Sequence, residues 1–250
     1  MNVVMQVSYD GTEFCGWQMQ PGCRTVQGVM QEAAEKIFSG HTAIVASGRT
    51  DAGVHALGQV VQFSAETAIP AEKLRECFNR LLPSDVKVLF SAEAPEGFDC
   101  TRAAKRKTYC YSAYYAPCEL PLVRRYAARL SRKPNVEAMK TAAQLLVGEH
   151  DFAAFRASGF TSKTSVRTVY DVNVTEENLV GGKLYRLYFT GNGFLYHMVR
   201  IAAGELFAIG CGKSEGISRA FESGKREALA RTMPPEGLTM VQTEYDRKLF

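Results

Sequence analysis

One short segment, SGRTDAGVHALGQVVQF, carries side chains that could do acid–base or nucleophilic chemistry. It places Arg49, Asp51 and His55 close together in the chain. A carboxylate must be ionised to act as a nucleophile or a base, and a neighbouring arginine favours that form. A tight turn is the alternative, because Asp-x-Gly suits an Asx turn and Gly53 tolerates a positive φ. Residue types alone leave both interpretations open.

A basic and aromatic run, RAAKRKTYCY, occupies residues 102–111. On a strand, Tyr109 and Tyr111 share one face. Cations that hold phosphates beside a ring that stacks on bases are a common RNA-binding combination. A solvated charge run that leads into a core strand is the alternative. The cations taken as candidate RNA contacts are Arg102, Lys105 and Arg106.

Three further segments contain candidate residues. In GNGFLYHMVR, Arg200 lies among apolar residues of an expected helix, which favours either a buried partner or a stem packed on the surface with its charge in water. In GEHDFAAFRASG, Arg156 could meet phosphate together with the nearby Lys163 and Arg167. The segment PPEGL, which ends at Leu238, has the composition of an ordinary turn before a last strand.

The apolar pattern predicts the elements that must position these side chains. In the first half we expect strands at 1–9, 43–47, 59–63 and 86–92, a helix from Val26 to Gly40, and a helix around 74–82 between Pro70 and Pro83. In the second half we expect strands at 107–115, 166–175, 184–190 and 239–245, a helix over 136–146 capped by Asn135, and a helix over 194–209.

Both halves therefore follow a β-α-β-β-α-β order. No Pro- or Ser-rich linker separates them, and the boundary falls near residues 95–105. We predict an α+β protein of two similar ferredoxin-like lobes, residues 1–100 and 101–250, that share a mixed, mainly antiparallel sheet.

Composition limits the class of protein. The net charge is +4, and no run of about 18 apolar residues indicates a membrane span. The N-terminus does not resemble a signal peptide. The seven cysteines contain no CxxC pair, which favours free thiols in a reducing cytoplasm and argues against zinc. Because the sequence lacks a P-loop, a GxGxxG after a strand and a GxSxG elbow, we expect no cofactor and no metal.

Six segments in order resemble the tRNA pseudouridine synthase A family along nearly the whole chain. They are YDGTEFCGWQMQP with TVQG, SGRTDAGVHALGQVVQF, KRKTYCYSAYY, LVGEHDFAAFR, GNGFLYHMVR and PPEGL. GRTDAGVHA is the most specific of them. The resemblance favours a catalytic Asp51 over a turn alone.

The resemblance implies a cofactor-free isomerase that converts uridine to pseudouridine in the anticodon stem-loop of tRNA, at positions 38 to 40. It implies a homodimer with an active-site cleft between the lobes. The family's essential aspartate falls on Asp51, its neighbouring arginine on Arg49 and its active-site tyrosine on Tyr109. The arginine that pairs with the aspartate falls on Arg200, and the leucine against the base falls on Leu238.

One departure concerns the segment before the basic run. Many relatives have an arginine where this chain has Thr101, and here Arg102 follows one place later. On a strand, a shift of one residue reverses the face, so this departure puts that contact in doubt. A second departure is Thr239, where relatives often have tyrosine.

Chemistry leaves alternatives open. Attack on C1′, attack on C6 and proton removal from the sugar are all compatible with a single carboxylate after the base has flipped out of its stem. A pseudouridine synthase with other RNA targets and a non-catalytic RNA-binding protein are both alternatives. A nucleosidase would need a second carboxylate, and none accompanies Asp51 in its motif.

Overall fold

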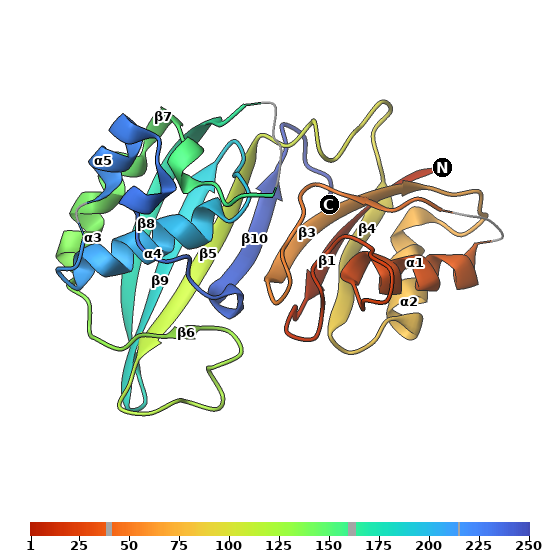
Figure 1. The fold of residues 1–250 in the computed structure, drawn as a ribbon. Coiled ribbons are helices and arrows are strands. Elements are labelled where there is room, and N and C mark those ends of the chain that lie inside the picture. The colour runs from red at the N-terminus through yellow and green to blue at the C-terminus, as the bar shows by residue number, and fades with distance from the viewer. Residues whose placement is uncertain (39–41, 160–163, 215) are drawn as a thin grey trace. The chain divides into compact units, whose positions relative to one another are not determined.

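The computed structural model describes residues 1–38, 42–159, 164–214 and 216–250. These residues form five α-helices and a mixed sheet of ten strands, so the predicted α+β class is confirmed (Figure 1). The chain divides into two compact units. The first unit comprises Met1–Lys105 and Met240–Phe250, and the second comprises Arg106–Thr239.

The first unit has the predicted β-α-β-β-α-β order. Its elements are β1 (Asn2–Tyr9), α1 (Val26–Ile37), β2 (Val45–Ala46), β3 (His55–Ser64), α2 (Ala71–Leu81) and β4 (Val86–Glu93). The strands lie in the antiparallel order β4-β1-β3-β2. The predicted end of the first helix at Gly40 lies outside the described residues.

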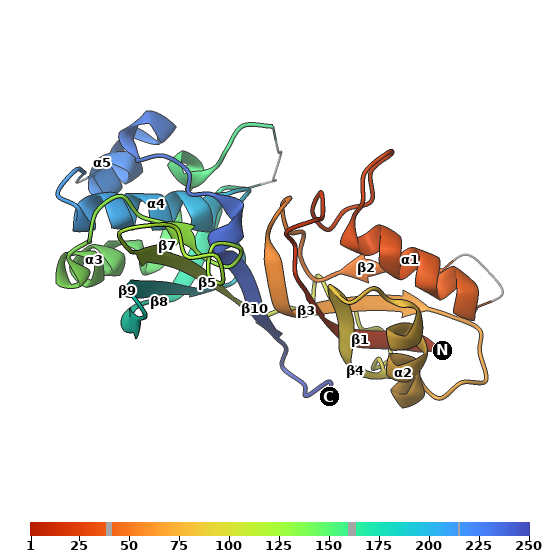
Figure 2. The same ribbon diagram turned by 90° about the horizontal axis from the view of Figure 1, so that it is seen from below.

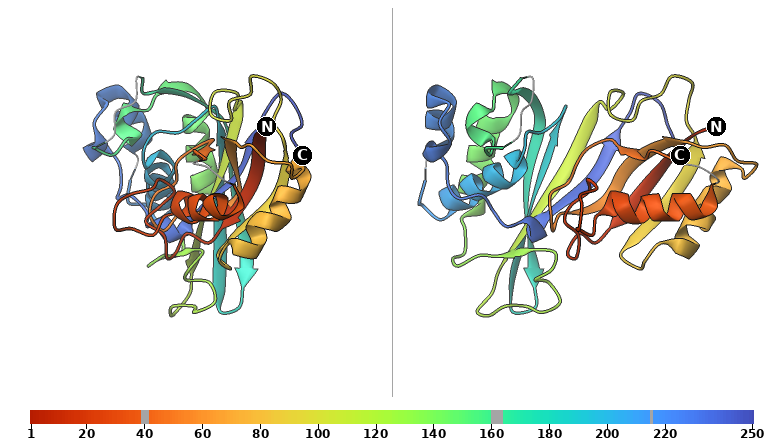
Figure 3. Two further views of the ribbon diagram at one scale, coloured as in Figure 1. Left: turned by 90° about the vertical axis from the view of Figure 1, so that its right-hand side faces the viewer. Right: turned by 45° about the vertical axis from the view of Figure 1, so that its right-hand side comes forward.

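Helices α1 and α2 cover one face of this sheet (Figures 1 and 3). Three aromatic rings fill the layer between these helices and the sheet. The rings of Phe38 and Phe63 lie 5.7 Å apart, and those of Phe63 and Phe78 lie 5.8 Å apart. Thr25 caps α1 by accepting a hydrogen bond from the Gly28 amide, and Pro70 precedes α2 as predicted.

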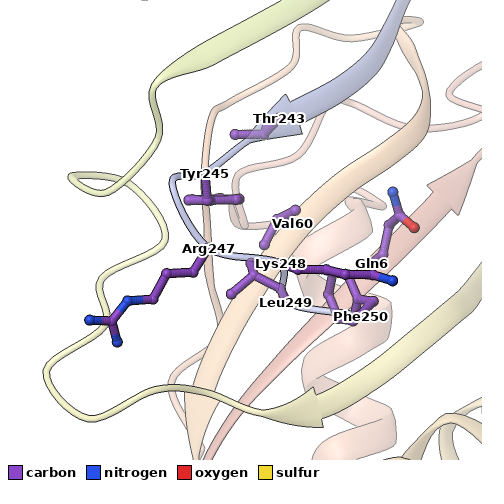
Figure 4. Close-up of a pocket in the computed structure, with 8 residues that line it drawn as sticks. All are labelled: Gln6, Val60, Thr243, Tyr245, Arg247, Lys248, Leu249 and Phe250. Atoms are coloured by element: carbon purple, nitrogen blue, oxygen red, sulfur yellow. The ribbon is translucent and has the colours of Figure 1, made fainter.

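The C-terminal segment covers part of the same sheet. Leu249 and Phe250 pack against a buried cluster that includes Val4 and Val60, and the ring of Phe250 lies 5.9 Å from that of Phe90. Figure 4 shows these terminal side chains beside Gln6 and Val60. The first half of strand β1 is consequently buried on both faces, at Val3, Val4 and Met5, whereas its second half alternates between buried and partly exposed residues.

The second unit repeats the element order with additions. Its elements are β5 (Arg106–Tyr115), β6 (Ala128–Arg129), α3 (Val136–Ala143), β7 (Gly148–Asp151), β8 (Val166–Leu179), β9 (Gly182–Gly191), α4 (Met198–Gly210) and α5 (Gly216–Ser223). Strand β10 (Leu238–Glu244) passes from the second unit into the first. The antiparallel order is β5-β9-β8-β7, and β6 pairs with β5 in parallel.

Two local predictions in this unit are confirmed. The Asn135 side chain accepts a hydrogen bond from the Ala138 amide and caps α3. The strands expected at 166–175 and 184–190 are present as β8 and β9, which form a hairpin around Val180 and Gly181, where Gly181 has a φ of +78°. Helices α3, α4 and α5 of this unit are seen together in Figure 2.

The predicted start of the helix over 194–209 is wrong, because α4 begins at Met198. His197 has a φ of +60°, the left-handed region, and a right-handed helix cannot pass through such a residue. Phe194 and His197 therefore precede the helix.

Candidate functional site

The segment Ser47–Val54 connects β2 and β3 and carries the candidate catalytic residue. A second segment, residues 10–18, holds it through backbone hydrogen bonds. The Trp17 amide donates to the Thr50 carbonyl oxygen at 3.0 Å, and the Gly53 amide donates to the Phe14 oxygen at 3.2 Å. Because two ladder-like bonds join segments far apart in sequence, the loop has one defined path.

Buried side chains also fix this loop. The Tyr9 hydroxyl and the Thr50 hydroxyl are 2.8 Å apart, and burial raises the pKa of Tyr9 to about 12. The Ser47 hydroxyl donates to Gln59 at 2.8 Å, and the Gln59 amide group donates to the Gly48 oxygen at 2.7 Å. Satisfied polar groups in a core specify one arrangement, because each would be costly to leave unpaired.

Asp51 itself is half-buried and Arg49 is exposed. The turn interpretation of this segment is correct as local structure. The Val54 amide donates to the Asp51 carbonyl oxygen at 3.2 Å, and Gly53 has a φ of +77°. A turn and a catalytic carboxylate do not exclude each other here, because the turn is what holds Asp51 at the end of β3.

His55 lies on strand β3 rather than on the loop, and it is 4% exposed. Its Nδ1 accepts a hydrogen bond from the Gly11 amide at 3.0 Å and lies 3.2 Å from Asp10 Oδ1. Accepting at Nδ1 requires the proton of the neutral ring to be on Nε2. These contacts make His55 a support of the loop.

Two glycines permit the close approach of the supporting segment. A Cβ on Gly11 would lie 2.0 Å from the Val54 oxygen, and a Cβ on Gly16 would lie 2.7 Å from the Thr50 oxygen. Gly16 also has a φ of +89°. Sequence patterns did not indicate this role of the glycines in packing against the Asp51 segment.

Tyr109 lies in the second unit, on β5, and is 9% exposed. It stands opposite Phe189 of β9 in the antiparallel register. Its ring meets the ring of Phe194 edge-on, with centroids 5.4 Å apart and an interplanar angle of 84°. The turn that precedes α4 therefore positions the edge of the tyrosine.

Arg200 belongs to the first turn of α4 and is half-buried. Its Nε donates to the Met233 carbonyl oxygen at 2.8 Å, and the Met233 amide donates back to the Arg200 oxygen at 3.2 Å. The Met233 carbonyl oxygen therefore serves as a partner of the kind that the sequence suggested for Arg200. The exchange ties α4 to the segment before Pro234.

Leu238 is 7% exposed and begins β10. The turn before it is a short 3-10 helix, Pro235–Gly237. The Tyr111 hydroxyl donates to the Pro234 oxygen at 2.8 Å, and a Cβ on Gly237 would lie 2.6 Å from the Tyr111 ring. Burial raises the pKa of Tyr111 far above its usual value. Tyr111 is therefore a support, a role that residue types and strand spacing alone did not distinguish from that of Tyr109.

The candidate RNA-binding cations lie at or near the surface. Arg102 approaches Asp99 at 3.6 Å, and Lys105 forms an ion pair with Asp246 at 3.0 Å. The Arg106 guanidinium lies over the Tyr170 ring, 4.9 Å from its centroid. Arg156 is half-buried. The cation proposed beside it, Lys163, lies outside the described residues.

Arg167, the other cation expected beside Arg156, forms hydrogen bonds within the start of its own strand, β8. It donates to the carbonyl oxygens of Thr164 and Val166, and burial lowers its pKa.

The Thr101 departure has a local explanation. Residues 101 and 102 form a turn, not the strand on which a shift would reverse the face. The Thr101 and Arg102 amides both donate to Asp99 Oδ1, at 2.8 and 3.0 Å, and the Thr101 hydroxyl donates to the Ala46 oxygen at 3.1 Å. Thr101 fastens the turn, and Arg102, 89% exposed, points to solvent.

Comparison with known proteins adds the family. The family model described as tRNA pseudouridine synthase matches residues 5–101 and 142–246. This chain belongs to the tRNA pseudouridine synthase family. Proteins named tRNA pseudouridine synthase A are 42% identical in Citrifermentans bemidjiense, over 99% of this chain and 98% of the relative, and 39% identical in Acetivibrio thermocellus, over 98% and 99%.

A chain in a crystal structure of a Cbf5–Nop10–Gar1 complex aligns with 96% of this chain and 58% of its own length. The identity is 13% and the TM-score is 0.35, a likeness too weak to support an argument.

The match to the tRNA pseudouridine synthase family covers the candidate residues unevenly. Arg49 and Asp51 lie in the first matched span, and Arg200 and Leu238 lie in the second. Tyr109 falls in residues 102–141, between the two spans, but within the alignment to the relatives. Asp51 with Arg49 and the other three residues belong to different compact units.

Two pockets of the first unit are lined by residues outside the Asp51 loop. One, of about 160 Å³, lies under the C-terminal residues in Figure 4, and another, of about 510 Å³, lies between residues 95–105 and 245–247. Within the described residues, no three Cys, His, Asp or Glu side chains gather as metal ligands would, and no helix is long and apolar enough to cross a bilayer.

Proposed function

We propose that this protein isomerises uridine to pseudouridine in tRNA. The observation that carries the proposal is the family match, which includes an Asp51 segment held in one path by buried hydrogen bonds. Relatives that align over nearly the whole chain are named tRNA pseudouridine synthase A. The resemblance in the sequence narrows the target to the anticodon stem-loop, positions 38 to 40.

Asp51 is the catalytic carboxylate in this proposal. The N1–C1′ bond of the nucleotide breaks, the free base turns, and a C5–C1′ bond forms. The product is an isomer, so the reaction requires no oxidant, no reductant and no energy source. A half-buried carboxylate on a defined turn meets the need for a group that is fixed yet reachable.

The other residues bind the flipped nucleotide. In this proposal Arg49 and Arg200 orient Asp51, Tyr109 holds the base, and Leu238 packs against it. Arg200 and Tyr109 are pre-positioned for this by Met233 and Phe194. The proposal requires that Asp51 of the first unit and these residues of the second address one nucleotide.

The stem-loop phosphates bind to cations at or near the surface. We assign this role to Arg102, Lys105, Arg106 and Arg156, of which the first three follow one another closely at the end of the first unit and the start of β5. Phosphate contacts position an RNA without reading its sequence. We further propose a cytoplasmic homodimer in which one tRNA contacts both subunits.

The central experiment replaces Asp51 by asparagine, which keeps the shape and removes the charge. We expect Asp51→Asn to bind a tRNA transcript with nearly unchanged affinity and to form no detectable pseudouridine. The matched control is Asp171→Asn on β8, where an exposed carboxylate is changed in the same way. Robust isomerisation by Asp51→Asn would remove the assignment of this residue.

A second experiment concerns the hydroxyl of Tyr109. Tyr109→Phe keeps the ring that packs on Phe194 and should remain folded, but it should turn over more slowly. Tyr170→Phe, at a more exposed position, is the control. Equal rates for Tyr109→Phe and the unmodified protein would exclude the hydroxyl from the reaction.

Two further measurements address the target and the assembly. In tRNA from cells that lack this protein, pseudouridine should be missing at positions 38 to 40. If pseudouridine is missing at other positions instead, those positions are the target. Sedimentation should give a dimer, and a monomer at working concentration would contradict the assembly.

A further inference from the structure

A small hairpin in the first unit carries two cysteines. Its tip is the sequence Gln20-Pro21-Gly22-Cys23, in which the Cys23 amide donates to the Gln20 oxygen at 3.4 Å and Gly22 has a φ of +71°. Proline at the second position and a glycine with positive φ at the third are typical of a type II turn. The turn brings the chain back toward Cys15.

The two arms of this hairpin are held together next to the cysteines. The Cys15 amide donates to the Arg24 oxygen at 2.8 Å. Arg24 is itself fixed, because its guanidinium pairs with both oxygens of Asp85 at 2.9 and 3.0 Å and lies over the Phe14 ring at 4.0 Å from the centroid. The residue after Cys23 is therefore anchored against Cys15.

The backbone bond between Cys15 and Arg24 places the two cysteines on adjacent positions across the hairpin. Both residues are exposed. The neighbouring Cys23 thiol is the main cause that raises the pKa of the Cys15 thiol, with burial and charge adding to it. The pKa effect agrees with the hairpin geometry, in which the residue after Cys23 is bonded to Cys15, and exposure lets a small oxidant reach both thiols.

We propose that Cys15 and Cys23 form a reversible intrachain disulfide, and that this pair is a site of thiol–disulfide exchange with low-molecular-weight disulfides such as oxidised glutathione. One cysteine thiolate attacks a glutathione sulfur, which releases one glutathione as a thiolate. The second cysteine thiolate then attacks the mixed disulfide and releases the other. Two protein thiols are oxidised and one glutathione disulfide is reduced to two thiols.

The hairpin lies in the segment that supports the Asp51 loop. Phe14 precedes Cys15, and Trp17 follows two residues later; both contribute backbone hydrogen bonds to that loop. A disulfide at this position closes a short ring of chain beside the support without replacing any of its hydrogen bonds. The site does not depend on which reaction Asp51 performs.

The test places the full-length protein in buffers of reduced and oxidised glutathione and follows the thiols by alkylation and tandem mass spectrometry. As the buffer becomes more oxidising, we expect two thiols per chain to disappear together and a peptide pair linked through Cys15 and Cys23 to appear. Dithiothreitol should restore both thiols. Cys118→Ser, which removes the third exposed cysteine, should leave this result unchanged.

Cys15→Ser and Cys23→Ser should each abolish the linked pair and leave a glutathione adduct on the remaining cysteine. Three results in the unmodified protein would overturn the proposal. These are stable glutathione adducts on both cysteines, a disulfide between molecules or with another cysteine, and thiols that stay free under conditions that glutathionylate a control peptide thiol. The readout is a covalent bond, so it is independent of pseudouridine formation.

Discussion

Two regions of this molecule each centre on a carboxylate, and they use it in opposite ways. Asp51 is half-buried on a turn between strands. Glu205 of α4 is completely buried, and it accepts hydrogen bonds from the Ser214 hydroxyl and from the Gly216 and Ala230 amides, the last two at 2.9 and 2.7 Å. Glu205 holds three parts of the second unit together by accepting their hydrogen bonds. For Asp51 the relation is reversed, because the neighbouring residues hold the loop that carries it.

The comparison shows what burial says about a carboxylate. A fully enclosed group with all its oxygens occupied by donors has a structural role, because no substrate can reach it. A reachable carboxylate needs other groups to supply its order. Around Asp51 these are the Tyr9–Thr50 contact, the Ser47–Gln59 contact and the backbone of residues 14–17.

The largest expected effect on stability is at Glu205. Glu205→Ala removes a buried group that accepts from the Ser214 hydroxyl and from the Gly216 and Ala230 amides, and it should lower the free energy of unfolding by about 4 kcal/mol, measured by urea unfolding. Glu222→Ala, at an exposed position of α5, should change it by less than about 0.5 kcal/mol. Equal stabilities of the two variants would refute the structural role of Glu205.

The next effect concerns the packing behind the Asp51 loop. Gly11→Ala introduces a Cβ 2.0 Å from the Val54 oxygen and should cost about 3 kcal/mol of stability while displacing the loop. In Gly22→Ala the new Cβ meets nothing within 4 Å, so only the strain of the positive φ lowers the free energy of unfolding, by about 1 kcal/mol. Thermal unfolding and pseudouridine formation should rank the two variants in this order, and the reverse order would contradict the close approach.

A smaller effect is expected at Tyr9. Tyr9→Phe removes the partner of a buried Thr50 hydroxyl and should cost about 2 kcal/mol, with a loss of activity because Thr50 adjoins Asp51. Tyr170→Phe, 41% exposed, is the control and should be nearly neutral. A neutral Tyr9→Phe would mean that the loop is held by its backbone bonds alone.

The smallest effect on stability is expected at the exposed cations. Lys105→Ala breaks an ion pair of a lysine that is 58% exposed and should change stability by less than about 0.5 kcal/mol. If Lys105 binds phosphate, tRNA affinity falls and the slope of log affinity against log salt decreases by about 1. Lys73→Ala on α2 should leave that slope unchanged, and identical slopes would remove Lys105 from the RNA contacts.

Much of the fold could be predicted from local patterns. The alternation of β1, the periodicity of α1 and α2, and the Asn135 cap each depend on residues close in sequence, and each is confirmed. Helix α5 and strands β6 and β7 were not predicted, because short elements carry too few residues to show a period. The predicted start of α4 was wrong because the left-handed backbone angle of His197 ends the possible helix there, and the sequence pattern does not show that angle.

For the site, sequence by itself determined the candidate residues. The spacing of Arg49 and Asp51 and the family resemblance singled out one carboxylate among 26 acidic residues. Tertiary structure alone decided which residues support it. Tyr9 and Thr50 are 41 positions apart, and Glu205 meets Ala230 over 25. A local pattern cannot encode such pairs, because the free energy that fixes them comes from burying both partners together when the chain folds.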